Sequence, residues 1–67
     1  MTEYTVHFQK GTRVGARSLR MERFEAESAG RAITKAKKAF PDLLRQGYRV
    51  IRVDHFDEDT QRLVLDY

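Results

Sequence analysis

A helical period runs through the stretch SAGRAITKAKKAF, residues 28–40, and constrains the fold more than any other feature of the chain. The apolar residues of this stretch recur at the spacing of one α-helical stripe, namely Ala29, Ala32, Ile33, Ala36 and Phe40. Ser28 precedes the stripe and can cap the exposed amides of the first turn. Because the stripe is mostly alanine, it predicts a helix that packs closely on a sheet.

Two stretches before the helix have the pattern of strands. In YTVHFQ, apolar and polar side chains alternate, as they do in a half-buried strand. In LRMERFEA, the apolar residues change phase between Leu19 and Phe24. Since a slip of one residue moves side chains to the opposite face of a sheet, we expect a β-bulge near Glu22 and Arg23.

The residues after the helix predict a second hairpin. Pro41 interrupts the helical stretch, and PDLLRQG is either a kinked extension of the helix or a separate helical turn that ends before Gly47. The stretch YRVIRVDHF is rich in β-branched residues, the turn DEDTQ follows it, and RLVLDY alternates again. This order of strand, turn and strand is typical of a hairpin.

Together these elements predict one α+β domain over residues 1–67 with the order β-β-α-β-β, an antiparallel sheet with one helix packed on one face. A chain of this length buries only roughly 60% of the surface that its unfolded form exposes, so the core must be small. One helix leaves the opposite face of the sheet uncovered. We expect Val50 and Phe56 there, either as an apolar patch that favours a dimer or a partner surface, or as scattered exposed residues.

The composition limits where such a chain can act. It has no cysteine, so disulfides and thiolate metal sites are excluded and a reducing cytoplasm is expected. No stretch approaches the roughly 18 apolar residues of a membrane span, and the first residues do not have the pattern of a leader peptide. We therefore expect a soluble cytoplasmic protein with no membrane partner.

The residues that carry out most enzymatic chemistry are scarce. The chain has two histidines, His7 on the polar side of a strand and His55 in the acidic stretch DHFDED. That stretch does not have the glycine and distant glutamate of a calcium loop, and it is more typical of an acidic turn. We expect no catalytic residues, no metal and no cofactor.

Positive charge is concentrated in the larger part of the chain. Residues 1–53 contain twelve Lys and Arg against five Asp and Glu, whereas residues 54–67 contain one against five. The stretch KGTRVGARSLR has four cations around two glycines, but not the glycine spacing of a phosphate-binding loop. It is either a charged hairpin connection that blunts edge pairing or an arm that binds phosphates or an acidic protein. Its candidate binding residues are Lys10, Arg13, Arg17 and Arg20.

A second basic surface is predicted on the helix. On a helical wheel Arg31, Lys35 and Lys38 face away from the alanine stripe, and Lys37 lies on the flank. No Asp or Glu lies between residues 28 and 40 to offset these charges. The ridge is either a solvated surface or a contact for an anionic partner.

The run FEAESAGRAITKAKKAF, a strand that passes directly into a basic helix, resembles small proteins of bacterial viruses, among them some anti-CRISPR proteins. The resemblance implies a non-catalytic inhibitor in the host bacterium's cytoplasm that occupies the DNA-binding surface of a CRISPR surveillance complex. It also implies that Arg31, Lys35 and Lys38 make contacts there.

Two functional hypotheses follow. The first is a non-enzymatic binding protein, encoded by a phage or mobile element, whose basic helix and loop bind a nucleoprotein complex, an acidic protein surface or, without sequence preference, nucleic acid. The second is a small structural or assembly protein that dimerises through an exposed sheet face.

Overall fold

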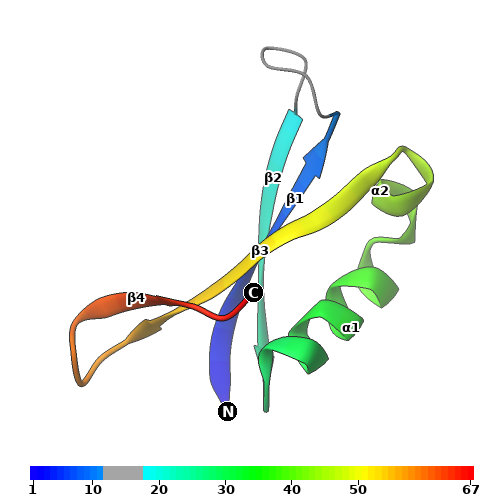
Figure 1. The fold of residues 1–67 in the computed structure, drawn as a ribbon. Helices are drawn as coiled ribbons and strands as arrows, with labels where there is room; N and C mark the ends of the chain where they lie inside the picture. The colour runs from blue at the N-terminus through cyan, green and yellow to red at the C-terminus, as the bar shows by residue number, and fades with distance from the viewer. Residues whose placement is uncertain (12–17) are drawn as a thin grey trace.

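The computed structural model describes residues 1–11 and 18–67, and it confirms the predicted α+β architecture (Figure 1). Its elements are β1 (Thr2–Lys10), β2 (Ser18–Ala26), α1 (Ala29–Ala39), α2 (Pro41–Arg45), β3 (Tyr48–Asp57) and β4 (Arg62–Leu65). The four strands form one antiparallel sheet in the order β2-β1-β3-β4. Figure 1 shows α1 on one side of this twisted sheet, with β4 at the far end of β3.

The pairing of β1 with β2 is regular from Thr2 and Ala26 to Lys10 and Ser18. β1 and β2 pair without a break, so the bulge predicted near Glu22 and Arg23 is wrong. The change of phase in β2 is instead a change of face, because successive side chains of a strand point to opposite sides. Leu19 and Met21 lie on the side away from α1, whereas Phe24 packs against the core. β2 thus exposes apolar residues in one half and buries them in the other.

The bulge of this sheet lies in β3. Arg52 pairs with His7 and Val50 pairs with Phe8, so Ile51 is an extra residue in β3. The bulge changes the phase of the strand, and it turns Val50 toward α1. The expectation that Val50 lies on the uncovered face is therefore wrong, because its side chain packs against the core.

The core lies between α1, α2 and the near face of the sheet. Its buried apolar residues are Tyr4, Val6, Phe8, Ala26, Ala32, Ala36, Leu43 and Val53. Phe8, Val6 and Val53 are its largest fully buried side chains, and full burial of each contributes about 1.5–3 kcal/mol. Ala32 and Ala36 of α1 are completely buried, which confirms the close approach of helix and sheet.

The ends of the helices follow from local sequence. Ser28 has an extended backbone and its Oγ accepts a hydrogen bond from the Arg31 amide at 3.3 Å, so it caps α1 as predicted. α1 ends at Phe40, and Pro41 starts α2 as a separate short helix. Gly47 then takes a positive φ of 96°, which turns the chain into β3.

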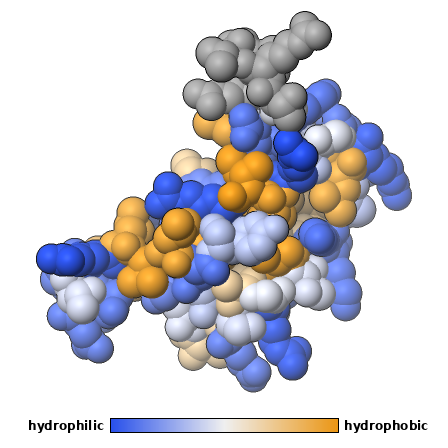
Figure 2. Space-filling view, viewed as in Figure 1, coloured by the Kyte–Doolittle hydropathy of each residue, from blue (hydrophilic) through white to orange (hydrophobic). Residues whose placement is uncertain are grey.

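We call the side of the sheet away from α1 the open face, because no helix of the described residues covers it. Alternation along the strands places six exposed apolar residues on it, including Phe56 as expected. These residues are Leu19, Met21, Ile51, Phe56, Leu63 and Leu65. Figure 2 shows exposed hydrophobic residues near the centre of the molecule and over β4.

Candidate functional site

The first half of α1 holds its cations in local contacts. Arg31 Nε lies 3.8 Å from the carboxylate of Glu27, one turn earlier. Lys35 Nζ donates a hydrogen bond to the carbonyl oxygen of Glu25 at 2.5 Å, which ties α1 to the end of β2. Two members of the predicted ridge therefore have local partners: Arg31 lies near the exposed carboxylate of Glu27, and Lys35 donates to the backbone of β2.

The last turn of α1 presents its cations to solvent. Lys37 and Lys38 are exposed, and among the described residues neither has a hydrogen bond or an ion pair. Cations at this position also interact favourably with the helix dipole, by about 0.3–1 kcal/mol each, and this is a sufficient structural reason for their presence. Their side chains nevertheless remain available to an external anion.

Arg20 of β2 is held at the same end of α1. Its guanidinium carbon lies 5.3 Å from the centre of the Phe40 ring, and its Nε donates a hydrogen bond to Glu22 at 2.9 Å. The Phe40 ring in turn contacts Phe24 edge to face, with ring centres 6.1 Å apart. This aromatic support fixes the guanidinium beside the last turn of α1.

Lys10 lies on the same side of the sheet as Arg20 and α1 and adds a fourth cation to this side of the molecule. It is the last residue of β1, and alternation places its side chain on the same side of the sheet as α1. It lies diagonally across the β1–β2 pair from Arg20, which pairs with Phe8. We call this group of cations the basic end, and it comprises Lys10, Arg20, Lys37 and Lys38. The other two predicted binding residues, Arg13 and Arg17, lie outside the described residues.

The opposite end of the molecule is acidic. β3 ends at Asp57 and the turn to β4 begins with Glu58 and Asp59; the Asp57 carboxylate accepts a hydrogen bond from the Asp59 amide at 2.9 Å. That bond is typical of an acidic turn, as the sequence predicts. Because β3 begins beside Lys10 and ends at Asp57, its length separates the basic end from this acidic end.

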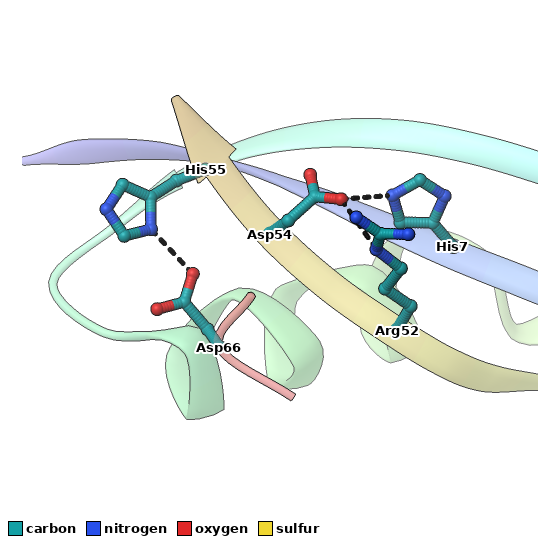
Figure 3. Close-up of polar contacts among 5 residues, drawn as sticks. All are labelled: His7, Arg52, Asp54, His55 and Asp66. Atoms are coloured by element: carbon teal, nitrogen blue, oxygen red, sulfur yellow. Dashed lines mark hydrogen bonds and ion pairs between the residues drawn. The ribbon is translucent and has the colours of Figure 1, made fainter. Parts of the chain in front are cut away.

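The open face has a polar network at its centre that the sequence did not predict (Figure 3). Asp54 is 4% exposed, and its Oδ2 lies 3.0 Å from His7 Nε2 and 2.9 Å from Arg52 Nε. An ionised carboxylate only accepts hydrogen bonds, so His7 Nε2 carries the hydrogen. The alternation of β1 puts His7 on this face, but its partner could be found only from the register of β1 and β3.

A second histidine contact joins the end of β3 to the C-terminal residues. His55 Nδ1 lies 2.6 Å from Asp66 Oδ2, and the His55 ring meets Tyr4 edge to face at 5.4 Å between ring centres. Both histidines are thus engaged by carboxylates. Within residues 1–11 and 18–67 there is no group of three or more histidine, cysteine or acidic residues that could hold a metal ion.

None of the described helices is long and apolar enough to cross a membrane. Comparisons with protein families, curated proteins and solved structures gave no match to this chain. The candidate sites are therefore judged by their own geometry, and among the described residues the basic end holds two cations, Lys37 and Lys38, that have no hydrogen bond or ion pair.

Proposed function

We propose that this protein is a non-enzymatic binding module that holds the phosphate backbone of nucleic acid at its basic end. The observation that carries the proposal is the exposure of Lys37 and Lys38 without a partner among the described residues. Arg20 and Lys10 extend the same positive surface across β2 and β1. Lys and Arg clustered on one surface are the usual electrostatic footprint of phosphate binding.

The basic end favours backbone contacts over base reading. Its nearby aromatic side chains, Phe40 and Tyr48, pack against the core, so they do not offer a ring on which bases could stack. Base-edge recognition usually requires a helix or strand that enters a groove with several polar side chains. Here the cations lie on a helix end and two strands, which suits contacts with phosphates without sequence preference.

The contacts of the two histidines support a binding function rather than catalysis. His7 and His55 each contact a carboxylate, and in the described part of the chain neither contacts a serine or threonine hydroxyl that it could activate. A general base needs the proton of a nucleophile within hydrogen-bond reach. The arrangement is therefore better suited to stabilising the sheet.

The expected affinity depends steeply on salt. Each phosphate neutralised on a duplex contributes a slope of about −0.9 to the logarithm of affinity against the logarithm of salt concentration. Four contacts thus predict a slope of about −3.6, which corresponds to a loss of roughly 150-fold between 50 and 200 mM salt. A protein that contacts its partner mainly through apolar groups would show a much smaller slope.

The test compares two variants with the same change of net charge. Lys37→Gln/Lys38→Gln removes two cations from the basic end, and Arg23→Gln/Arg62→Gln removes two exposed cations elsewhere. We expect the first variant to bind an arbitrary-sequence duplex at least about tenfold more weakly at 50 mM salt, with a slope lower by about 1.8. The second variant should bind like the original protein, and equal losses in both variants would contradict a localised site.

The phosphates can belong to free nucleic acid or to a nucleoprotein complex. The resemblance to anti-CRISPR proteins makes a CRISPR surveillance complex the nucleoprotein to try, and we place both partners and this protein in the bacterial cytoplasm. The same two variants are therefore tested for binding to a purified surveillance complex. Binding to the complex but not to the free duplex would assign the protein to the nucleoprotein. Binding to neither at 50 mM salt would overturn the proposal.

A further inference from the structure

The six exposed apolar residues of the open face form two groups. Leu19, Met21 and Ile51 form the first group, on β2 and the bulge of β3. Phe56, Leu63 and Leu65 form the second group, on the end of β3 and on β4. Each of these side chains is between 41% and 64% exposed.

The polar network lies between the two groups. Met21 pairs with His7 of the network, and Leu65 pairs with Asp54. His7 and Asp54 lie on neighbouring strands with only the pair of Val6 and Val53 between their rows, so the groups lie on opposite sides of a common centre. A hollow of about 270 Å³ adjoins the first group and is lined in part by His7, Met21 and Ile51.

The amount of exposed apolar surface is large for this chain. From the exposed fractions, the six side chains together present on the order of 600 Å², which the polar network divides into two groups; the largest contiguous apolar patch on a typical monomer is about 300–600 Å². A standard interface buries about 800 Å² per partner, with an apolar centre and a polar rim. The open face thus has enough apolar area for most of one such interface.

The charges around the two groups have opposite signs. Arg49 lies in the same cross-strand row as Leu19, at the outer edge of the first group, because both residues pair with Gln9 of β1. Glu3 and Glu25 pair with each other at the opposite end of the sheet, and Glu3 lies near the acidic turn. Arg23 on the same face lies 4.0 Å from Glu3, so this margin carries two carboxylates and one cation and remains net negative. A second copy placed face to face with the first, with its strands antiparallel, would therefore bring Arg49 of one molecule toward the acidic end of the other.

We propose that the open face binds a second copy of this chain, with the two molecules face to face and antiparallel. In this arrangement the first group of each molecule covers the second group of its partner, and the basic margin of each faces the acidic margin of the other. A two-fold symmetric interface requires such a self-complementary surface. The parallel arrangement would place like charges together, which opposes association.

The experiment uses sedimentation velocity of the full chain between 5 and 500 μM, together with two variants. Leu19→Glu/Met21→Glu places negative charge in the first group, and Leu63→Lys/Leu65→Lys places positive charge in the second. We expect the original protein to reach twice its monomer mass of 7.9 kDa at the higher concentrations. Each variant alone should remain monomeric throughout the range.

Mixing the two variants tests the pairing itself. In a mixed dimer one half of the interface joins the introduced glutamates to the introduced lysines, and the other half keeps the original apolar contact. We therefore expect the equimolar mixture to form dimers that neither variant forms alone. Circular dichroism and thermal unfolding of each variant establish that it is folded, and Thr34→Glu/Ala39→Glu, on the exposed side of α1, is the control that should still dimerise.

Three results would overturn the proposal. The first is that the protein without substitutions stays monomeric at 500 μM, in which case another partner covers the open face. The second is a folded variant that dimerises as well as the original protein. The third is a mixture that remains monomeric, because the first group would then not pack on the second. Duplex binding at the basic end is measured separately, so either proposal can fail without the other.

Discussion

His7 and Asp54, 47 residues apart in the chain, share a hydrogen bond of 3.0 Å between Nε2 and Oδ2 across β1 and β3. The same oxygen of Asp54 lies 2.9 Å from Arg52 Nε. The carboxylate is almost fully buried, although the sheet face around it has no helix over it. Two cationic or hydrogen-bonding groups thus compensate for the burial of one charge, as a buried carboxylate requires.

This contact makes Asp54 the polar residue whose replacement should destabilise the fold most. We expect Asp54→Asn to lower the free energy of unfolding by about 1.5–3 kcal/mol, because Arg52 loses its charge partner and His7 loses its charged acceptor. Urea denaturation measures the change. Asp66→Asn is the matched control, since Asp66 also contacts a histidine but is more exposed. If the two variants lose the same free energy of unfolding, the burial of Asp54 does not increase its contribution to stability.

Two glycines should respond to alanine with opposite signs. Gly47 has a φ of 96°, so Gly47→Ala should cost about 1–2 kcal/mol of stability through backbone strain alone, since an added Cβ meets no atom within 4 Å. Gly30 lies inside α1, where an added Cβ would meet only Ser28 Oγ at 3.9 Å. Gly30→Ala should therefore stabilise the protein by about 0.5–1 kcal/mol. Thermal or urea unfolding of both variants checks the prediction, and a shared sign would contradict it.

The stacking of Arg20 on Phe40 predicts energetic coupling between β2 and the end of α1. A double-mutant cycle with Arg20→Ala and Phe40→Leu should give a coupling free energy of about 0.5–1 kcal/mol, the value typical of an exposed cation–π contact. Leucine keeps most of the apolar volume and removes the ring. If the effects of the two substitutions simply add, the contact does not position Arg20, and the basic end loses its support.

Much of the fold could be predicted from the sequence because its periods are clear. The stripe of α1, its cap at Ser28 and the start of α2 at Pro41 are local features, and each is confirmed. The position of the bulge could not be predicted. A phase change in a strand has the same pattern whether it reflects a bulge or a change of buried face, and only the pairing with β1 shows that Ile51 is the extra residue.

The candidate site could be predicted only in part, for a related reason. A helical wheel places the cations of α1 on its outer side, but it treats the helix alone. The contacts that use Arg31 and Lys35 come from Glu27, just before the helix, and from a backbone carbonyl of β2, an acceptor that no residue type indicates. The role of Arg20 likewise depends on the tertiary contact with Phe40.

The bulge at Ile51 also divides the β1–β3 ladder into two segments of different register. During folding, neither segment can extend into the other by simple zipping, because the chain must first leave one residue of β3 unpaired at the boundary. If the extra residue is placed elsewhere, some side chains between Val50 and Val53 exchange faces and leave the core. The position of this single residue therefore decides which side chains of β3 face α1 and pack around Phe8 and which face the open side.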